Sequence, residues 1–348
     1  MNYNEALNFI EKKQSLGIMP GLSRILELLD KMGNPQNKIK IIHIAGTNGK
    51  GTVAKNIADA LIENGCKVGL FTSPWVIDYR EQIQLNNEFI SKDDFAKYVE
   101  EYKNNDCSEF ELLSAIMFKY FADNEVDFAV VECGLGGRDD ATNVEKENLS
   151  VITSISYDHM NYLGNTLEEI AENKSGILRK NSACIIYGDE FQNIFENKCK
   201  KLIISPQSDN LSIVNTALRY LGYKEIKALK SLPARQERIK GILLDGSHNE
   251  AAGKMLEPLI DNEVALIGMM KDKEVEKYLS IIAPKCKRII ATTVNNPRAM
   301  KADELFEIAK KYCSDVCICE DAKRAIENEK ITLICGSFYL AREVRNLI

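Results

Sequence analysis

The sequence predicts an α/β protein of two domains, each built on a mostly parallel sheet. Short runs rich in Ile and Val alternate with stretches of helical periodicity along almost all of the 348 residues. Strands that are apolar throughout are typical of parallel sheets whose two faces are both covered by helices. The chain length also suits two domains of ordinary size.

The N-terminal part contains four expected strands, which are apolar runs bounded by turn signals at residues 39–45, 67–73, 126–132 and 151–155. A Gly-rich turn after the first strand leads into an amphipathic helix that reaches about residue 63. Residues 110–124 place apolar side chains at helical spacing. Thr166 and Glu169 have the spacing of a capping box. Two weaker apolar runs then precede a helix at about 210–221.

The C-terminal part begins near Pro233, so we expect domains at residues 1–231 and 232–348. Further apolar runs alternate there with helical stretches, at residues 241–245, 264–268, 288–294, 316–320 and 331–337. A terminal helix follows the last run. This regular alternation predicts a smaller, Rossmann-like, doubly wound domain.

Composition and charge exclude several classes of protein. With 45% apolar and 28% charged residues, the chain is neither disordered nor fibrous. A net charge of −6 gives no general attraction to nucleic acid or to anionic membranes. No apolar run approaches the ~18–20 residues of a membrane span, and the N-terminus lacks the basic start of a signal peptide. The ten cysteines form no C-x-x-C pair, which favours free thiols in a reducing compartment. We therefore expect a cytoplasmic protein.

The segment AGTNGKGT at residues 45–52 predicts a phosphate-binding loop. Its glycines allow successive backbone N–H groups to point at an anion. Lys50 would neutralise phosphate charge, and Thr52 would offer a hydroxyl to Mg²⁺. Gly46 stands too close to Gly49 for the strict G-x-x-x-x-G-K-[ST] pattern. A strand before the segment, a helix after it and glycines around one lysine still favour this interpretation over an incidental turn.

Polar residues at other strand ends could complete the same site. Ser73 closes the second strand, and Glu132 ends a wholly apolar one, where a carboxylate is well placed to hold Mg²⁺ beside a nucleotide. His159 and His248 lie just beyond strand ends, whereas His43 lies within the first strand and is expected in the core. The alternatives are a solvated acid at Glu132 and histidines that only cap loops.

The order and content of these motifs resemble the folylpolyglutamate synthase/dihydrofolate synthase branch of the Mur ligases. The resemblance is carried by AGTNGKGT, TSP, VECGLGGRDDATN, TSISYDHMNYLGNT, the Lys-Ser-Gly-Ile run and DGSHN. It implies an ATP-dependent ligase in which a carboxylate of a pteroate or folate attacks the γ-phosphate of ATP. The amino group of L-glutamate then displaces phosphate from the acyl phosphate. The implied partners are these small-molecule substrates and two Mg²⁺ ions, with no nucleic acid or membrane, on a monomeric protein whose domains close over the ligands.

The resemblance also implies roles for individual residues. The nucleotide-binding residues would be Gly49, Lys50, Gly51, Thr52, Asn215, Arg235 and Asp245. The metal ligands would be Thr52, Ser73, Glu132, His159 and a carbamylated Lys174. The catalytic residues would be Lys50, Glu132, His159, Lys174 and Arg235. The pterin pocket would use Gly21, Leu22, Ser23 and Arg24, and the glutamate site would use His248 and Ser337.

Two departures from the family pattern leave other functions open. Trp75 stands where the family usually has a histidine in TSPHL. Only 60 residues lie between Lys174 and Arg235, so we expect strands at the far edge of the central sheet to be missing. One alternative is a Mur-type amide ligase with another carboxylate acceptor. A nucleotide-binding regulator that has lost ligation is disfavoured, because the expected metal and arginine positions are all present.

Overall fold

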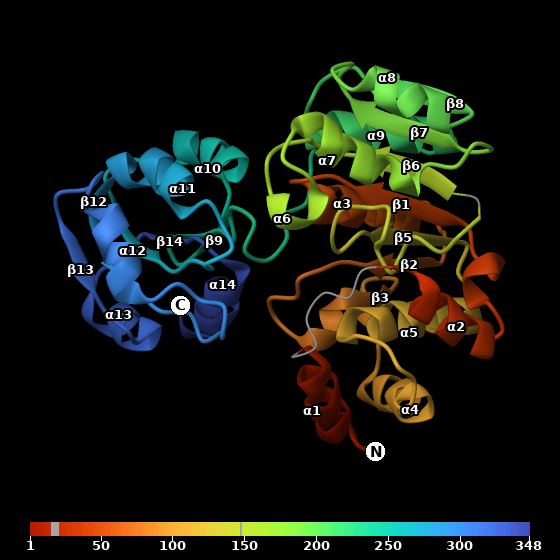
Figure 1. Cartoon of the computed structure of the whole chain (residues 1–348), viewed down its shortest axis with the longest axis horizontal. Helices are drawn as coiled ribbons and strands as arrows, with labels where there is room; N and C mark the ends of the chain where they lie inside the picture. Colours follow the sequence, from red (N-terminus) through yellow and green to blue (C-terminus); the bar gives the residue numbers. More distant parts are fainter. Residues whose placement is uncertain (15–20, 147) are drawn as a thin grey trace. The chain divides into compact units, whose positions relative to one another are not determined.

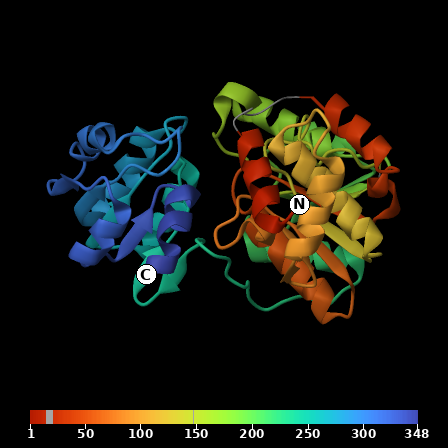
Figure 2. The same cartoon turned by 90° about the horizontal axis from the view of Figure 1, so that it is seen from below.

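The computed structural model describes residues 1–14, 21–146 and 148–348. Contacts within the chain divide it into two units. Unit 1 consists of Met1–Pro74, Arg80–Ile155 and Leu163–Lys230, and unit 2 consists of Trp75–Tyr79, Ser156–Tyr162 and Ser231–Ile348. Two short segments of the N-terminal part thus fold with unit 2, in addition to the C-terminal part expected from the sequence. Figures 1 and 2 show the N-terminus on unit 1 and the C-terminus on unit 2.

Unit 1 is built on a sheet with the strand order β4-β3-β2-β5-β1-β6-β7-β8. The strands are β1 Ile41–Ala45, β2 Val68–Phe71, β3 Ile83–Leu85, β4 Glu88–Phe89, β5 Phe128–Glu132, β6 Asn148–Ile152, β7 Ala183–Tyr187 and β8 Lys201–Ser205. All pairs from β2 to β8 along this order are parallel, whereas β3 pairs antiparallel with both β2 and β4. The mostly parallel sheet is confirmed, whereas the hairpin was not predicted.

Alternate residues of β1 face the two helical layers of unit 1. Ile42 and Ile44 are buried in a core shared with α3 (Lys50–Glu63) and α9 (Asn210–Leu221). Ala45 belongs instead to a second core, on the opposite face. This burial on both faces explains why the strand is apolar along its whole length.

Unit 1 contains further helices besides α3 and α9. They are α1 Tyr3–Gln14, α2 Ser23–Lys31, α4 Lys92–Tyr102, α5 Glu109–Asp123, α7 Leu167–Lys174 and α8 Gln192–Phe195. Ser108 and Thr166 form capping boxes at the starts of α5 and α7, as the Thr166–Glu169 spacing predicted for α7. Gly222 ends α9 with a positive φ of 83°.

The sheet of unit 1 ends at β8. In the part of the chain that the structure describes, no strand pairs with the outer edge of β8. Lys201 and Ile204 of this strand are exposed. An open edge at this position agrees with the expectation that the chain lacks covering strands there.

Unit 2 is built on a sheet with the strand order β13-β12-β11-β14-β10-β9. The strands are β9 Glu237–Ile239, β10 Ile242–Leu244, β11 Glu263–Ile267, β12 Cys286–Ala291, β13 Val316–Ile318 and β14 Leu333–Cys335. The five predicted strands are present and parallel, and β9 is an additional antiparallel strand. This is the doubly wound fold that the sequence predicts (Figure 1).

Helices cover both faces of the unit 2 sheet. They are α10 Glu250–Leu256, α11 Val275–Ile282, α12 Ala302–Ala309, α13 Ala322–Asn328 and α14 Phe338–Val344. The short helix α6 Met160–Leu163 follows β6, and its last residue belongs to unit 1. One core lies under α10, α11 and α12 and the other under α13 and α14. Val76 packs in the second core with Leu244 and Leu340.

Short 3-10 helices complete both units, at η1 Pro35–Lys38, η2 Tyr79–Gln82, η3 Ser175–Ile177, η4 Glu196–Lys198, η5 Glu257–Leu259, η6 Ala283–Lys285 and η7 Arg345–Leu347. Among the described residues, no helix combines the length and the apolar character that crossing a bilayer requires.

Candidate functional site

The carboxyl ends of neighbouring strands bring the candidate residues of unit 1 to one edge of its sheet. The strands β2, β5, β1 and β6 are adjacent and parallel. Ser73 follows β2, Glu132 ends β5, and the phosphate loop follows β1. Ligands of open α/β sheets bind at this edge.

The phosphate loop is held by backbone and hydroxyl contacts to the segment after β6. The N–H of Thr47 donates to the carbonyl of Ser154 (2.7 Å), and the hydroxyl of Thr153 donates to the carbonyl of Asn48 (2.7 Å). A Cβ on Gly46 would lie 1.8 Å from the Thr153 hydroxyl oxygen. The glycine that departs from the strict pattern is therefore needed for close packing against Thr153.

Lys50 and Thr52 lie in the first turn of α3, with Gly49 as the N-cap in the left-handed conformation. The Nζ of Lys50 donates to the carbonyl of Thr47 (3.2 Å), so the side chain folds back over the loop. The positive end of the α3 dipole lies at the same place. Loop, lysine and helix start together favour the binding of an anion.

Glu132 is buried, with 2% of its surface exposed, and one of its carboxylate oxygens accepts the N–H of Ser73 (3.0 Å). The alternative of a solvated acid is therefore wrong. Carboxylate and hydroxyl oxygens are donors that suit Mg²⁺, so Glu132, Ser73 and Thr52 are of the right chemistry for this ion.

Lys174 is also buried, with 3% of its surface exposed, at the end of α7. Its Nζ donates to the carbonyl of Gly46 (3.0 Å). The chain thus brings a lysine 128 positions away in the sequence to the phosphate loop. Burial of an ammonium group is costly unless it is paired, so a buried lysine at this edge is a candidate for function.

A cluster of charged side chains forms in unit 2 around Asp158. Lys273 donates to an Asp158 oxygen (2.7 Å), and Asn249 donates to the other (3.1 Å). His159 lies beside Lys273 (Nε2 to Nζ, 3.0 Å), and His248 Nε2 lies 3.7 Å from Asp158. Burial raises the pKa of Asp158, but His248, His159 and Lys273 outweigh it, so the pKa is well below its usual range.

The Asp158 cluster contains both histidines predicted beyond strand ends and three residues that sequence reasoning missed. Asp158 directly precedes His159, and Asn249 directly follows His248. The neighbouring histidines could therefore have indicated both residues. Lys273 lies 115 positions from Asp158, and no local pattern indicated it.

Arg235 and Asp245 are two further predicted site residues of unit 2. Arg235 precedes β9, and Asp245 directly follows β10. The guanidinium of Arg235 stacks on the ring of Phe338, 4.3 Å from its centroid. Asp245 accepts the backbone N–H groups of Gln236 (2.7 Å) and Ser247 (2.8 Å). These contacts leave the Asp245 carboxylate tied to the backbone rather than to Arg235.

His248 and Ser337 also contact the backbone. His248 Nδ1 lies 2.8 Å from the carbonyl oxygen of Gly246. The hydroxyl of Ser337 is buried and accepts the N–H of Tyr339 (3.0 Å) as the N-cap of α14.

Asn215 and the segment 21–24 have structural partners of their own. Both groups of the Asn215 carboxamide bind the backbone of Ile226 (3.0 and 2.8 Å). Arg24, in the first turn of α2, pairs with the buried Glu111 (3.2 Å). The contacts that the structure gives for Asn215 and Arg24 are with these partners, outside the phosphate loop.

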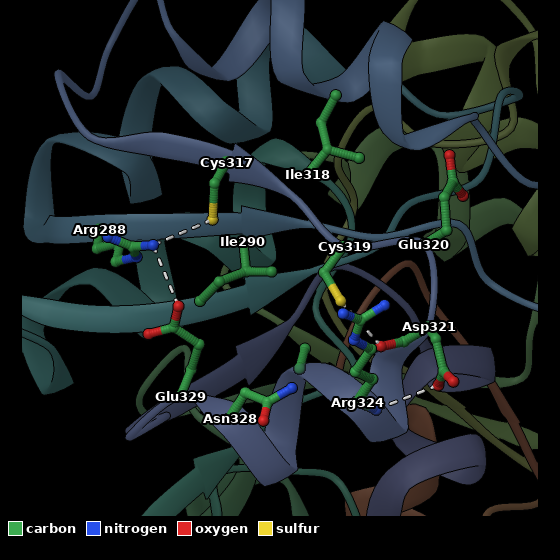
Figure 3. Close-up of a pocket in the computed structure, with 11 residues that line it drawn as sticks. Arg288, Ile290, Cys317, Ile318, Cys319, Glu320, Asp321, Arg324, Asn328 and Glu329 are labelled. Carbon is green, nitrogen blue, oxygen red and sulfur yellow. Dashed lines mark hydrogen bonds and ion pairs between the residues drawn. The ribbon is translucent and has the colours of Figure 1, made fainter.

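A cavity of about 580 Å³ lies in unit 2 between β13 and α13. None of the predicted site residues lines this cavity. In Figure 3 Arg288 points toward Cys317 and Glu329 at one end of the cavity. Its guanidinium pairs with Glu329 (3.1 Å) and Asp315 (3.3 Å), so the positive charge is already compensated. In the described residues, no group of three or more His, Cys, Asp or Glu side chains is arranged to hold a metal ion.

Comparisons with known proteins agree with this geometry. Residues 44–249 match the family model of the Mur ligase middle domain. A dihydrofolate synthase/folylpolyglutamate synthase from Bacillus subtilis is 32% identical over 424 aligned positions, which cover 99% of this chain and 98% of the relative. The aligned length exceeds the 348 residues of the chain, so the relative contains segments that this chain lacks.

Solved structures show the same fold. The folylpolyglutamate synthase of Mycobacterium tuberculosis, complexed with ADP and AMPPCP, has 25% identity and a TM-score of 0.87, with 99% of each chain covered. The bifunctional enzyme of Yersinia pestis, complexed with AMPPNP and a Mn ion, has 23% identity and a TM-score of 0.84, covering 100% of this chain and 98% of the other. The chain therefore belongs to the folylpolyglutamate synthase/dihydrofolate synthase family of the Mur ligases and is an ATP-dependent ligase.

Proposed function

We propose that the protein couples L-glutamate to dihydropteroate, to tetrahydrofolate and its polyglutamates, or to both, through an acyl phosphate. The proposal is supported by the Bacillus subtilis relative, whose name covers both activities and which aligns over the whole chain. A Mur-type ligase with a different carboxylate acceptor is not favoured, because the curated relatives that align over most of the chain are folate enzymes.

One observation carries the proposal: two buried, oppositely charged side chains lie at the same edge as the phosphate loop. Glu132 accepts the N–H of Ser73, and Lys174 donates to the carbonyl of Gly46. Buried charged groups of this kind concentrate at functional sites, and a ligand that carries several charges would interact with both. A nucleotide triphosphate with divalent metal is such a ligand.

In this proposal, the backbone of Gly49, Lys50 and Gly51 binds the phosphates, and the Lys50 ammonium neutralises the charge of the transferring group. Arg235 adds a planar, permanent positive charge, and its stacking on Phe338 limits the freedom of its side chain. Asp245 and Asn215 are proposed as further nucleotide contacts, with the family resemblance as their only support.

Magnesium fits the donor set of unit 1. Thr52, Ser73 and Glu132 of unit 1 would hold a first Mg²⁺ ion, and His159, which folds with unit 2, would hold a second. The ions would supply charge neutralisation for the phosphoryl groups. Carbamylation of Lys174 would convert a buried cation into an anion, which suits a position close to divalent ions.

The amino acid and the folate would use other residues. His248 and Ser337 are proposed to bind L-glutamate, and Gly21, Leu22, Ser23 and Arg24 to line the pterin pocket. We further propose that the protein works as a monomer.

The deciding experiment measures ADP release from ATP with L-glutamate and one acceptor at a time, either dihydropteroate or tetrahydrofolate. ADP release and a glutamylated product with one or both acceptors would support the proposal. ADP release that needs neither folate nor glutamate, or no release with either acceptor, would contradict it.

A further inference from the structure

A network of buried polar side chains lies two residues before the end of β1. His43 is fully buried, and its two ring nitrogens contact residues about 100 positions later. Nδ1 lies 2.7 Å from a carboxylate oxygen of Glu145, and Nε2 lies 2.8 Å from the hydroxyl of Thr142. Both partners belong to the loop after β5, which carries the GLGGRDDATN motif.

The hydrogen positions in this network follow from its acceptors. The single hydroxyl hydrogen of Thr142 is donated to Asp140 (2.5 Å), so Thr142 accepts from His43. The carboxylate of Glu145 also accepts, so Nδ1 of His43 donates to it, while Nε2 lies close to both the Thr142 hydroxyl and the Cys133 thiol (3.1 Å). Burial lowers the pKa of His43, but Cys133 and Glu145 outweigh it, and the pKa is raised well above its usual range. The result is a buried ion pair between β1 and the loop.

Arg179 extends the network from Glu145 to the chain segment that contains Lys174. Its Nε donates to the carbonyl of Glu145 (2.9 Å), and one terminal nitrogen lies 3.7 Å from the Glu145 carboxylate. The same nitrogen donates to Asn143 (2.6 Å), and the other terminal nitrogen donates to the carbonyl of Gly176 (3.0 Å). Asn143 donates to the same Gly176 carbonyl (3.1 Å). The guanidinium therefore joins the loop after β5 to the residues that follow α7.

Close backbone packing makes this junction specific. A Cβ on Gly137 would lie 2.7 Å from the carbonyl oxygen of Lys174, and a Cβ on Gly176 would lie 2.4 Å from the Cα of Arg138. The two segments can approach so closely only because both positions are glycine. Lys174, two residues before Gly176, places its Nζ on the carbonyl of Gly46 in the phosphate loop.

We propose that His43, Glu145 and Arg179 are positioning residues that hold Lys174 against the phosphate loop. The consequence for catalysis rests on the proposed function, in which Lys174 lies beside the metal ions. The network begins at His43 on β1, three residues before Gly46. It ends at Lys174, whose Nζ donates to the carbonyl of Gly46, so both ends of the network lie at the phosphate loop. Loosening any member would displace Lys174 while leaving the nucleotide-binding backbone intact.

The test uses the Arg179→Met variant of the full chain, which keeps the length of the side chain but removes its donors. The reactivity of Lys174 toward acetic anhydride is measured by peptide mass spectrometry, without ATP and in bicarbonate-free buffer, well below the melting temperature. We expect labelling of Lys174 to rise severalfold over the wild type. We also expect kcat to fall roughly 10- to 100-fold with KM for ATP little changed, because misplacing a catalytic group by about 1 Å has effects of this size.

Two further variants complete the experiment. Arg179→Lys keeps a positive charge beside Glu145 with fewer donors, so it should give intermediate labelling and kcat, and it replaces Arg179→Met if that variant does not fold. Arg219→Ala removes an exposed arginine that pairs with Glu225 and is the matched control. It should change neither quantity.

The outcomes separate this inference from the proposed function. Increased labelling together with reduced kcat supports both. Increased labelling with undiminished kcat supports the positioning network and removes Lys174 from the proposed chemistry. Unchanged labelling of Lys174 in folded Arg179→Met or Arg179→Lys protein overturns the inference, whatever the turnover.

Discussion

In unit 1 the side chains around the phosphate loop are held by backbone groups, whereas in unit 2 the charged side chains hold one another. Lys50, Lys174 and Glu132 each contact a backbone carbonyl or N–H of a neighbouring loop. Asp158 and Lys273 form a direct ion pair, with 10% and 8% of their side-chain surface exposed.

Substitutions should have different effects on side chains held by the backbone and on side chains held by an ion pair. The loss of a side chain that is hydrogen-bonded to the backbone should affect chemistry more than stability. Removing one member of a buried ion pair leaves an uncompensated charge and is strongly destabilising. Variants at Lys50 and Glu132 should therefore be folded but inactive, and variants that break the Asp158–Lys273 pair should be destabilised.

The largest effect is expected for Lys50→Ala in unit 1. ADP release should fall by about 100- to 1,000-fold, the usual cost of removing a group that stabilises the transition state electrostatically. The circular dichroism spectrum should stay that of the wild type. Lys55→Ala, one turn further along α3, is the control and should retain activity. Substantial turnover by Lys50→Ala would argue against the assigned phosphate loop.

Glu132→Gln should have the next largest effect. The amide oxygen of glutamine can still accept the N–H of Ser73, so the fold is kept while the negative charge is lost. The Mg²⁺ concentration for half-maximal ADP release should rise roughly tenfold or more. Glu27→Gln, an exposed acid on α2, serves as the control. A Mg²⁺ titration identical to that of the wild type would remove Glu132 from the metal site.

Lys273→Met should destabilise unit 2 by about 3 kcal/mol, because it breaks a largely buried ion pair. The single tryptophan of the chain, Trp75, folds with unit 2, so its fluorescence in urea reports the unfolding of that unit. The control Lys277→Met removes an exposed pair with Glu274 and should change the free energy of unfolding by less than about 1 kcal/mol. Equal effects of the two variants would show that the Asp158 cluster is not a stabilising unit.

The smallest effect is a change in pH dependence. Because the pKa of His43 is raised in the folded protein, its stabilising contribution is complete below the unfolded value of about 6.5 and is lost as pH rises through the folded value. Wild-type melting temperature should therefore fall more steeply at alkaline pH than that of His43→Gln. Parallel curves for the two proteins between pH 6 and pH 10 would contradict a raised pKa of His43 in the folded protein.

The sequence predicts those parts of the molecule whose signals are local. Apolar runs identify the parallel strands, and the spacing of glycines and lysine identifies the phosphate loop. The short β3–β4 hairpin escaped prediction, although its turn residues Asn86 and Asn87 both adopt the positive φ that asparagine tolerates. Three-residue and two-residue strands have too few alternating positions for a periodicity signal.

The parts that could not be predicted depend on contacts across long sequence separations. Lys273 reaches Asp158 over 115 positions, and His43 reaches Glu145 over 102. The sequence placed His43 in the core, which the structure confirms, but nothing local distinguishes a buried histidine from one that is buried with a carboxylate partner. Such pairings are decided by which loops the sheet order brings together.

The division of the chain has a consequence for its synthesis and for its dissection. Residues 75–79 and 156–162 fold with unit 2, so the backbone passes between the units five times. Val76 cannot reach its partners Leu244 and Leu340 until nearly the entire polypeptide has emerged from the ribosome. Cleavage after Lys230 would separate residues 75–79 and 156–162 from the rest of unit 2, so the C-terminal fragment would not be an autonomous module.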